Sequence, residues 1–418
     1  MTQILPAAFW TTMHVEAHAP SGTSVKSVDH EGLATRFGLH SPAVRKPDPM
    51  IPKPQTSEPM KALNAVCPYY TMFPLEFPLR VLRGRAQPDD WVLDPFCGRG
   101  TTNFAARLLG LPSCGVDSSP VAVALTRAKL ADARAADVIR VASNILQARP
   151  SRVSVPQGEF WERAFEKTVL QQICWLRKEL LRNCKSDSRI LLRAILLGAL
   201  HGPRTKVAAS HLSNQCPRTF APKPDYAVRF WRKRRLSPPR VDVLDVVATR
   251  AHRYLGHRPA HTPTVVTLGD SRADGVFGFH KFRWIVTSPP YYGMRTYIPD
   301  QWLRSWFLGG PSKVAYRPPQ RELAHSSPDV FAADLRRVWQ NAASSAQGDA
   351  RLVVRFGGIA DRDVNPMNLL KLSLKDSGWR LRTVVSAGDA NAGRRQATQF
   401  VHRGPAPKEE HDYYAMLA

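Results

Sequence analysis

The chain has 418 residues, of which 59 are Lys or Arg and 34 are Asp or Glu, so its net charge is +25 at neutral pH. This length exceeds that of a typical single core and favours one large domain with an insertion, or two domains. The positive charge favours a polyanionic partner over a surface that is basic only for solubility, because cations that neutralise phosphates release bound counterions.

Cysteine usage and hydropathy exclude further classes of protein. The six cysteines form no Cys-x-x-Cys pair, so the sequence does not support a zinc site, and a reduced, cytoplasmic setting is expected. The longest apolar run, Ile190 to Leu200, contains Arg193 and is too short to cross a bilayer. We interpret it as a buried helix and expect no membrane association.

The first 60 residues are interpreted as a loosely structured arm. Six prolines lie between Ser41 and Met60, and such a density blocks regular backbone pairing and favours extended structure. We therefore expect the folded part of the chain to begin near residue 61.

Residues 61–150 contain an alternation of strands and helices. Trp91–Asp94 is a short apolar strand that ends in an acid, and a helix follows at residues 101–109. Pro112–Asp117 is a second strand ending in an acid, followed by a second helix over residues 120–130. This order is typical of a parallel sheet with crossover helices.

Residues 151–260 interrupt this alternation with a basic insertion. They hold 22 Lys and Arg against 8 Asp and Glu, a net charge of +14. The insertion begins with an amphipathic helix in which apolar residues recur from Phe160 to Leu176 at steps of three and four, and it ends in the basic run 229–235. Aromatic residues lie between the cations, and the polar stretch His211–Gln215 could also read base edges. The cations expected to contact a polyanion are Arg204, Lys206, Arg218, Lys223, Arg229, Arg232, Lys233, Arg234 and Arg235.

Residues 261–418 resume the strand pattern. The expected strands are 264–268, 282–287, 351–356, 381–386 and 397–402. Together with the two earlier strands they predict one α/β domain whose sheet has about seven strands. The basic insertion then lies between the second and the third strand.

The turn after the first strand is expected to bind a nucleoside that carries an amino acid. Gly98 and Gly100 allow the backbone to approach a ligand, but the third glycine of a dinucleotide site and the lysine of a phosphate loop are both absent. Asp94, Asp117 and Asp270 each end a strand, where they can meet an ammonium group, two ribose hydroxyls and an adenine amino group respectively. Because ligands bind at the carboxyl edge of such sheets, three acids at three strand ends carry more weight than the glycines alone.

The run from Phe282 to Gly293 places a rigid Ser-Pro-Pro-Tyr turn directly after a strand. Consecutive prolines fix the backbone and hold carbonyl acceptors in place. Such a loop suits an aromatic amino group, because the Ser288 hydroxyl and the Pro289 carbonyl can accept its two hydrogens and direct its lone pair at a methyl sulfonium. Pro290 completes the turn, and Tyr291 can stack on a base that has left the duplex. Methylation of a ring carbon would need a thiol after a proline, and the sequence has no Pro-Cys pair.

Together, the turn from Asp94 to Thr102 and the segment Thr287–Gly293 resemble the cofactor and catalytic motifs of amino-group DNA methyltransferases of the restriction-modification type. The resemblance implies a Rossmann-like class I methyltransferase fold, with a mostly parallel sheet, helices on both faces and a largely helical insertion that recognises the target. It also implies S-adenosylmethionine as cofactor, double-stranded DNA as partner and, in a restriction-modification system, a cognate endonuclease. A segment upstream, at residues 69–74, is similar to the part that closes over the cofactor in this family. The cofactor-contacting residues implied are Asp94, Phe96, Gly98, Gly100, Thr101, Asp117, Asp270, Thr71 and Phe73.

Several alternatives remain open at this point. The Ser-Pro-Pro-Tyr form resembles the branch that methylates cytosine N4 more than the branch that methylates adenine N6. The Gly-rich motif also occurs in enzymes that methylate amino groups of RNA bases. A DNA-binding protein without catalysis is disfavoured by the intact motifs. The position of the insertion before Asp270 departs from the family's known motif orders, so the class within the family is open.

Overall fold

The fold is described from a computed structural model that covers most of the chain after residue 60. The described residues are 61–69, 73–149, 153–202, 211–216, 223–257, 259–293, 297–314, 323–358, 364–389 and 409–418. All of them belong to the unit Ala43–Ala418, the second of two units into which backbone contacts divide the chain. The arm expected at residues 1–60 and the strand expected at 397–402 lie outside the described residues.

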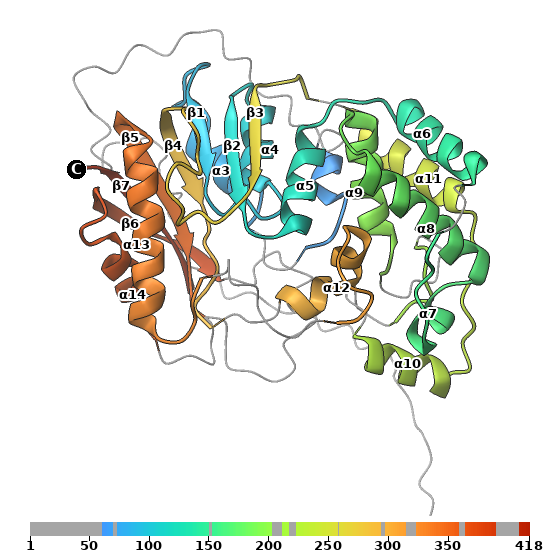
Figure 1. The fold of residues 1–418 in the computed structure, drawn as a ribbon. Coiled ribbons are helices and arrows are strands. Elements are labelled where there is room, and N and C mark those ends of the chain that lie inside the picture. Colours follow the sequence, from blue (N-terminus) through green and yellow to red (C-terminus); the bar gives the residue numbers. More distant parts are fainter. Residues whose placement is uncertain are drawn as a thin grey trace, which may run out of the picture. The chain divides into compact units, whose positions relative to one another are not determined.

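A seven-stranded sheet forms the centre of the fold, with the strand order β3-β2-β1-β4-β5-β7-β6 (Figure 1). Pairing is parallel from β3 through β5, whereas β7 runs antiparallel to both of its neighbours. The order matches that of dinucleotide-binding sheets except for this inserted antiparallel strand. It is the Rossmann-like class I methyltransferase fold expected from the sequence. The strands are β1 Trp91–Asp94, β2 Ser113–Asp117, β3 Thr264–Leu268, β4 Phe282–Thr287, β5 Ala346–Phe356, β6 Trp379–Asp389 and β7 Glu409–Leu417.

Alternate residues of the strands fill cores on the two faces of the sheet. Val92 of β1 and Val286 of β4 pack with α3 (Glu76–Leu82) and α4 (Thr101–Leu108), while Leu93 and Ile285 pack in the cluster of α13 (Pro328–Ser344) and α14 (Pro366–Leu374). This follows from the two-residue period of a strand. The expectation of helices on both faces is therefore confirmed.

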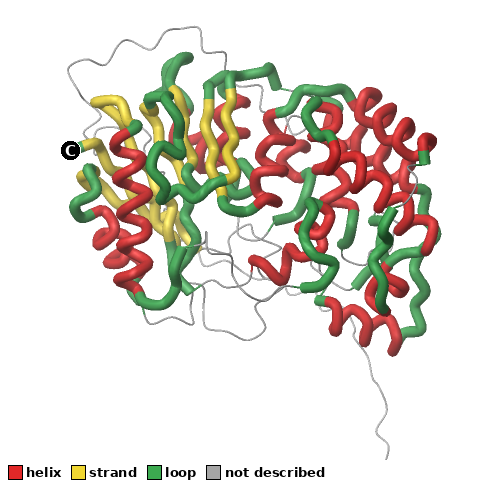
Figure 2. The backbone as a smooth tube through the Cα atoms, in the orientation of Figure 1, coloured by secondary structure: helices red, strands yellow, loops and turns green. Residues whose placement is uncertain are grey.

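A layer of helices extends from α5 (Pro120–Leu130) and lies between β2 and β3 in the chain. In Figure 2, the right-hand part of the molecule consists of helices and loops without strands among the described residues. It consists of α6 Ala135–Ala148, α7 Glu159–Ala164, α8 Lys167–Arg182, α9 Asp187–Ala199, α10 Pro224–Lys233 and α11 Val243–Leu255. Because α6 contacts α8, α9 and α11, the layer includes a helix that precedes residue 151. One hydrophobic cluster joins the layer to α4, α5 and α12 (Tyr297–Phe307).

The amphipathic helix expected from Phe160 to Leu176 is two helices, and that prediction is wrong. Phe165 is extended between them, and the Glu166 carboxylate accepts hydrogen bonds from the amides of Thr168 and Val169. A side chain that caps the first amides of α8 starts a new helix there. The buried helix expected near 190–200 is confirmed as α9, whose residues from Leu191 to Ala199 are buried apart from the half-buried Arg193.

Candidate functional site

The Gly-rich turn connects the end of β1 to the start of α4. Both Gly98 (φ 51°) and Gly100 (φ 76°) have left-handed backbone, which favours glycine. A Cβ on Gly100 would also lie 2.8 Å from the side chain of Thr126. The amide of Gly98 donates to Asp117 Oδ2 at 2.8 Å, so the turn is tied to the end of β2.

Asp94, the last residue of β1, is fully buried beneath this turn. Its Oδ1 accepts hydrogen bonds from the Phe96 amide at 3.1 Å and from the Thr287 hydroxyl at 2.6 Å. Its Oδ2 has no hydrogen-bond partner among the described residues. Burial raises the pKa of Asp94 to about 6, and the hydrogen bond from Thr287 opposes that rise. A buried carboxylate with one unsatisfied oxygen is suited to a cationic group.

Asp117, at the end of β2, is half-buried. Besides the Gly98 amide, it accepts a hydrogen bond from the Ser119 amide at 2.8 Å through Oδ1. Desolvation raises the pKa of Asp117 to about 6, and the two amide hydrogen bonds oppose it. Each carboxylate oxygen accepts one amide bond and keeps a lone pair for another donor.

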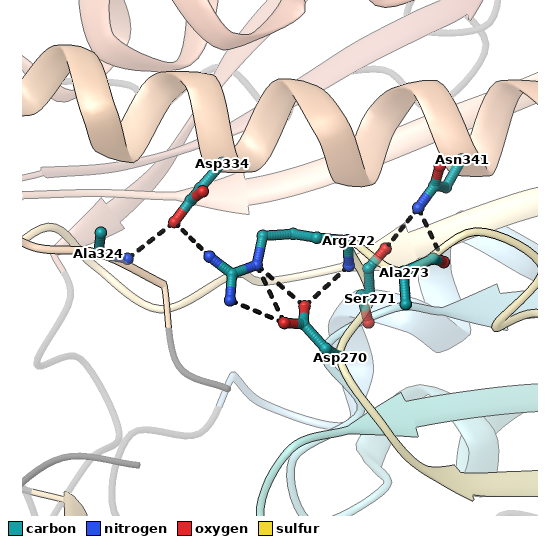
Figure 3. A network of polar contacts seen from close by, with 7 residues as sticks. All are labelled: Asp270, Ser271, Arg272, Ala273, Ala324, Asp334 and Asn341. Atoms are coloured by element: carbon teal, nitrogen blue, oxygen red, sulfur yellow. Dashed lines mark hydrogen bonds and ion pairs between the residues drawn. The ribbon is translucent and has the colours of Figure 1, made fainter. Parts of the chain in front are cut away.

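Asp270, after β3, lies in a polar network (Figure 3). Arg272 donates to both of its oxygens, at 2.7 Å from Nη2 and 3.0 Å from Nε, and its Nη1 reaches Asp334 of α13 at 2.8 Å. Asn341, also on α13, donates to the carbonyls of Ser271 and Ala273. The hydrogen bonds that Arg272 donates to Asp270 stabilise the charged guanidinium and raise the pKa of Arg272. The turn is thus fixed to α13, and contact between Asp270 and an adenine remains a prediction.

The Ser-Pro-Pro-Tyr loop opens at the same sheet edge as the Gly-rich turn. β4 is the parallel neighbour of β1, and the Thr287–Asp94 hydrogen bond joins their ends. The hydroxyl of Thr102, in the first turn of α4, donates to the Val286 carbonyl at 3.1 Å. Ser288 and Pro290 are half-buried and Pro289 is buried. The two motifs, which are 187 residues apart between Thr101 and Ser288, therefore meet in space.

The position of Tyr291 differs from the one expected. Its ring is 8% exposed and packs edge-on against Phe356, and its hydroxyl donates to Glu410 of β7. In this position the ring supports the loop from the buried side, and its stacking on a base stays a prediction. The next residue, Tyr292, is half-buried and contacts Phe331, so its ring retains an exposed part at this edge, as does that of Phe96.

The remaining predicted cofactor residues are only partly located. Phe96 is half-buried and lies 6.2 Å from Trp339, ring to ring. Thr101 is buried in the first turn of α4. Phe73 packs edge-on against Phe77 of α3, and Thr71 lies outside the described residues. Their contact with a cofactor stays a prediction.

The basic surface of the helical layer is centred on α10. The buried Trp231 anchors this helix, and Arg232 forms an ion pair with Glu159 of α7. Tyr226 is 48% exposed and stacks on Phe230. The exposed predicted cations are Lys223, Arg229, Arg232, Lys233, Arg234 and Arg235, whereas Arg204, Lys206 and Arg218 lie outside the described residues.

The stretch His211–Gln215 does not form part of this surface, so its expected role in reading bases is wrong. Ser213 and Asn214 are buried. The Asn214 amide nitrogen donates to the carbonyls of Arg163 and Leu236, and the Ser213 hydroxyl contacts His201 Nδ1 at 2.7 Å. These polar side chains satisfy buried backbone and side-chain groups.

Residues that the sequence left without a role contribute to the site. Thr287 and Thr102 join the two motifs, Arg272 holds Asp270, and Glu410 holds Tyr291. Thr287 and Thr102 lie inside the motifs and could have been found by asking what partners Asp94. The partners from α13 and β7 are distant in sequence and carry no local signal.

A family model described as DNA methylase matches residues 16–128. The match includes the Gly-rich turn and Asp117, and it ends before the helical layer and Ser288. The resemblance to this family is confirmed. No curated protein sequence matches the chain.

Solved structures of methyltransferases align with the chain at low identity. The rRNA methyltransferase AviRa from Streptomyces viridochromogenes is 12% identical, over 84% of this chain and 87% of its own, with a TM-score of 0.29. A TehB-like SAM-dependent methyltransferase from Corynebacterium glutamicum is 11% identical, over 82% and 87%, with a TM-score of 0.28. Geranyl diphosphate methyltransferase in complex with SAM is 10% identical, over 82% and 84%, with a TM-score of 0.31. At these values the alignments decide neither substrate nor activity.

The described residues contain neither a membrane-spanning helix nor a cluster of metal ligands. Among them, no helix combines the length and the apolar character needed to span a bilayer. The same part of the chain holds no group of His, Cys, Asp and Glu side chains suited to a metal ion.

Proposed function

We propose that the chain transfers a methyl group from S-adenosylmethionine to the exocyclic amino nitrogen of a base in duplex DNA, with cytosine N4 as the favoured target. The observation that carries this proposal is the hydrogen bond between Thr287 and Asp94, which joins the Gly-rich turn to the Ser-Pro-Pro-Tyr loop. A methyl donor held at the first loop would face a base held at the second. The match to the DNA methylase family supports the same reaction.

The residues of the turn fit this cofactor. Asp94 Oδ2 is buried and unsatisfied, so it would accept a hydrogen bond from the ammonium of the methionine moiety. The half-buried Asp117 has lone pairs left for the ribose hydroxyls. The left-handed glycines leave the backbone open to close approach. When bound there, S-adenosylmethionine supplies an electrophilic methyl group.

The loop after β4 would position the target nitrogen. An aromatic amino group is a weak nucleophile because its lone pair is delocalised into the ring. Ser288 Oγ and the Pro289 carbonyl would accept its two hydrogens, which favours a pyramidal nitrogen with its lone pair directed away from the loop. Catalysis is then mainly positioning, without a covalent enzyme intermediate. The sequence has no Pro-Cys pair, as ring-carbon methylation would require.

The choice of DNA rests on charge and on the family match. A net charge of +25 and the exposed cations of α10 suit a polyphosphate backbone. Adenine N6 is the alternative target within the same reaction, since both bases offer an exocyclic amino group. A base amino group of RNA is the alternative outside it.

The test uses the full chain with S-adenosylmethionine labelled in its methyl group and with equal amounts of duplex DNA, transfer RNA and ribosomal RNA. We expect label in DNA, released on hydrolysis as N4-methylcytosine. Release as N6-methyladenine would change the target base and keep the reaction class. Label only in RNA, or bound cofactor without transfer to any nucleic acid, would refute the proposal.

A further inference from the structure

Three buried basic side chains lie where the Gly-rich turn meets the helical layer. Arg99 stands between the two glycines of the turn, Lys129 is in the last turn of α5, and Arg304 is in the last turn of α12. Their exposed fractions are 7%, 1% and 3%. None of the three forms an ion pair with a carboxylate in the part of the chain that the structure describes.

The contacts of Arg99 and Lys129 bring both to the segment before α3. Arg99 Nη1 makes a long contact of 3.5 Å with the Cys67 carbonyl. Lys129 Nζ donates to Asn64 Oδ1 at 2.7 Å and lies 6.0 Å from the centre of the Phe104 ring. These two cations therefore contact residues only three positions apart.

Arg304 is linked to the same segment through α9. Its Nε donates to the Leu197 carbonyl at 3.2 Å. The next residue, Gly198, packs so closely on the segment that a Cβ there would lie 2.3 Å from the Val66 carbonyl oxygen. In addition, Arg304 Nη1 donates to Gln301 Oε1 at 2.7 Å.

Four buried nitrogen atoms of this group have no hydrogen-bond partner among the described residues. They are Arg99 Nε, Arg304 Nη2, Gln301 Nε2 and His201 Nε2. Burial, with His211 and Arg304 nearby, lowers the pKa of His201 to about 3, so its ring is neutral at neutral pH. Arginine and amide nitrogens are donors and cannot act as acceptors, so what is missing from the group is an acceptor.

Another buried arginine shows that this fold can satisfy a guanidinium with its own backbone. Arg107 of α4 is 2% exposed and donates to four carbonyl oxygens. The acceptors are the carbonyls of Lys129, Ala131, Pro259 and Ala260. Burial alone therefore does not account for the unsatisfied donors of Arg99 and Arg304, although single Nε atoms of Arg193, Arg283 and Arg336 also lack a partner among the described residues.

Arg99 keeps its charge despite burial, whereas burial lowers the pKa of Lys129 well below its usual range. Burial lowers the pKa of Arg99 only to about 10, so this side chain is a cation at neutral pH. Burial raises the pKa of the Cys67 thiol, and the nearby cations Arg304, Arg250, Arg99 and Lys129 oppose that rise without supplying a carboxylate. A buried cation that is neither paired nor neutralised is strongly unfavourable.

We propose that Arg99 and Arg304, with Lys129, Gln301 and His201 around them, form a binding site for a small oxyanion, either phosphate or the carboxylate of a bound small molecule. An oxyanion offers several acceptor lone pairs and a negative charge, which match the unsatisfied nitrogens and the positive charge. The inference concerns the folded chain and stands whether or not the proposed reaction does.

The first test measures the thermal unfolding of the full chain in inorganic phosphate and in chloride at equal ionic strength, up to about 10 mM, where general salt effects are small. Because a ligand that binds only the folded state stabilises it, we expect phosphate to raise the melting temperature by about 2 °C or more relative to chloride. Equal melting temperatures in the two salts would overturn the proposal for phosphate. The proposal for a carboxylate would then stand only if S-adenosylmethionine raises the melting temperature more than its decarboxylated analogue does. If the two compounds raise the melting temperature equally, the oxyanion proposal fails.

A charge-reversing test uses Gln301→Glu, which places a carboxylate beside Arg304 without changing the size of the side chain. We expect this variant to melt at a higher temperature than the wild type in chloride and to lose the response to phosphate. Gln147→Glu, at an exposed site on α6, carries the same change in net charge and should keep the wild-type response. A Gln301→Glu variant that is less stable than wild type in chloride would show that the group is already neutralised and would overturn the proposal.

The source of the oxyanion follows from the same measurement with saturating S-adenosylmethionine. If the cofactor's carboxylate occupies the site, the response to phosphate disappears in its presence. If the site is separate from the cofactor, the response remains. Both outcomes support the oxyanion site and differ only in what fills it.

Discussion

At the residue scale, the two motifs are joined by a buried hydrogen bond between a hydroxyl and a carboxylate group. Thr287 gives its hydrogen bond to one oxygen of Asp94, and burial leaves the other oxygen without a partner. The Ser288 hydroxyl stands one residue further along, at the half-buried start of the loop. The chemistry proposed here therefore depends on three residues at the ends of two neighbouring strands, Asp94 of β1 and Thr287 and Ser288 at the end of β4, each of which can be tested by a single substitution.

Ser288→Ala should lower turnover and leave cofactor affinity nearly unchanged. The substitution removes one of two acceptors of the amino hydrogens, and losing one positioned hydrogen bond at a reacting group typically costs about 10²-fold in rate. The measurement is kcat with duplex DNA, together with the dissociation constant for S-adenosylmethionine by calorimetry. Ser143→Ala on α6 serves as the control and should change neither value. A Ser288 variant with wild-type kcat would remove this residue from the mechanism.

The raised pKa of Asp94 predicts a pH-dependent stability. Because the pKa rises from 3.8 to about 6 on folding, the folded state binds a proton that the unfolded chain releases near pH 4. The resulting stability is fully present below about pH 4 and is lost as pH rises through 6. Relative to Asp94→Asn, the wild type should lose about 2 kcal/mol of unfolding free energy between pH 4 and 7.

Denaturant titrations of both proteins without cofactor give this difference. Asp117, whose pKa is also raised to about 6, is present in both proteins and cancels in the comparison. A difference that stays constant across this pH range would mean that Asp94 is not desolvated as described. Cofactor affinity should follow the opposite trend and increase as pH rises through 6, because an ammonium binds the ionised carboxylate.

The residues whose positions were correctly expected from the sequence are those fixed by local rules. Asp94 and Asp117 end strands and Ser288 follows one, and the ends of neighbouring parallel strands meet at one edge. Tyr291 and the stretch His211–Gln215 were expected to contact bases because of their chemical type alone. Their burial depends on Glu410 and on the carbonyls of Arg163 and Leu236, which are remote in sequence and cannot be read from a local pattern.

At the element scale, strands with apolar runs were predictable and a strand rich in polar residues was not. β1, β3 and β4 keep the bounds expected from the sequence. β7 has the sequence Glu-Glu-His-Asp-Tyr-Tyr-Ala-Met-Leu, in which apolar and polar residues do not alternate as they do in a typical strand. Two of its acids are buried because Asp412 pairs with Arg355 and Glu410 accepts a hydrogen bond from Tyr291. Paired acids can occupy core positions, and sequence patterns do not reveal the pairing.

The α10 surface should set the salt dependence of DNA binding. Arg229, Lys233 and Arg234 are exposed on or just after this helix, and each phosphate contact contributes about 0.9 to the slope of log affinity against log salt concentration. The triple substitution of these residues by Gln should therefore reduce the slope by up to about 3 and weaken binding to all sequences alike. Fluorescence anisotropy with a labelled duplex at several salt concentrations gives the slope.

The matched control removes three exposed arginines that form ion pairs within the helical layer, Arg134, Arg140 and Arg182. Their substitution by Gln changes the net charge equally. If both triple variants lower the slope by the same amount, net charge alone governs binding and α10 is not the contact surface. Only a larger effect at α10 agrees with the proposal.

At the scale of the whole molecule, the basic insertion is part of the same core as the cofactor site. The sequence indicated its charge and its place between the second and third strands, but not how it packs. One hydrophobic cluster contains Phe104 of α4, Leu125 of α5, Leu176 of α8, Ile195 of α9 and Val247 of α11. Their exposed fractions are all 0%. Helices that share such a core are stabilised together, since each covers the apolar face of the next.

This shared core predicts that the insertion cannot be removed as an independent recognition domain. Replacing residues 151–260 by a short flexible linker would expose the apolar side chains of α4, α5 and α12 that the layer now covers. Losing contacts for one large buried side chain costs about 2–5 kcal/mol, and a whole domain has only about 5–15 kcal/mol of stability. We therefore expect the shortened chain to be insoluble, or unfolded by circular dichroism. The intact chain should unfold in a single cooperative transition, and cofactor binding should raise the melting temperature of that whole transition. A shortened chain that folds and binds S-adenosylmethionine with native affinity would show instead that the sheet and the helical layer are separate domains. The proposed oxyanion site would then lose its structural basis, because Arg99 belongs to the Gly-rich turn and Arg304 contacts the helical layer.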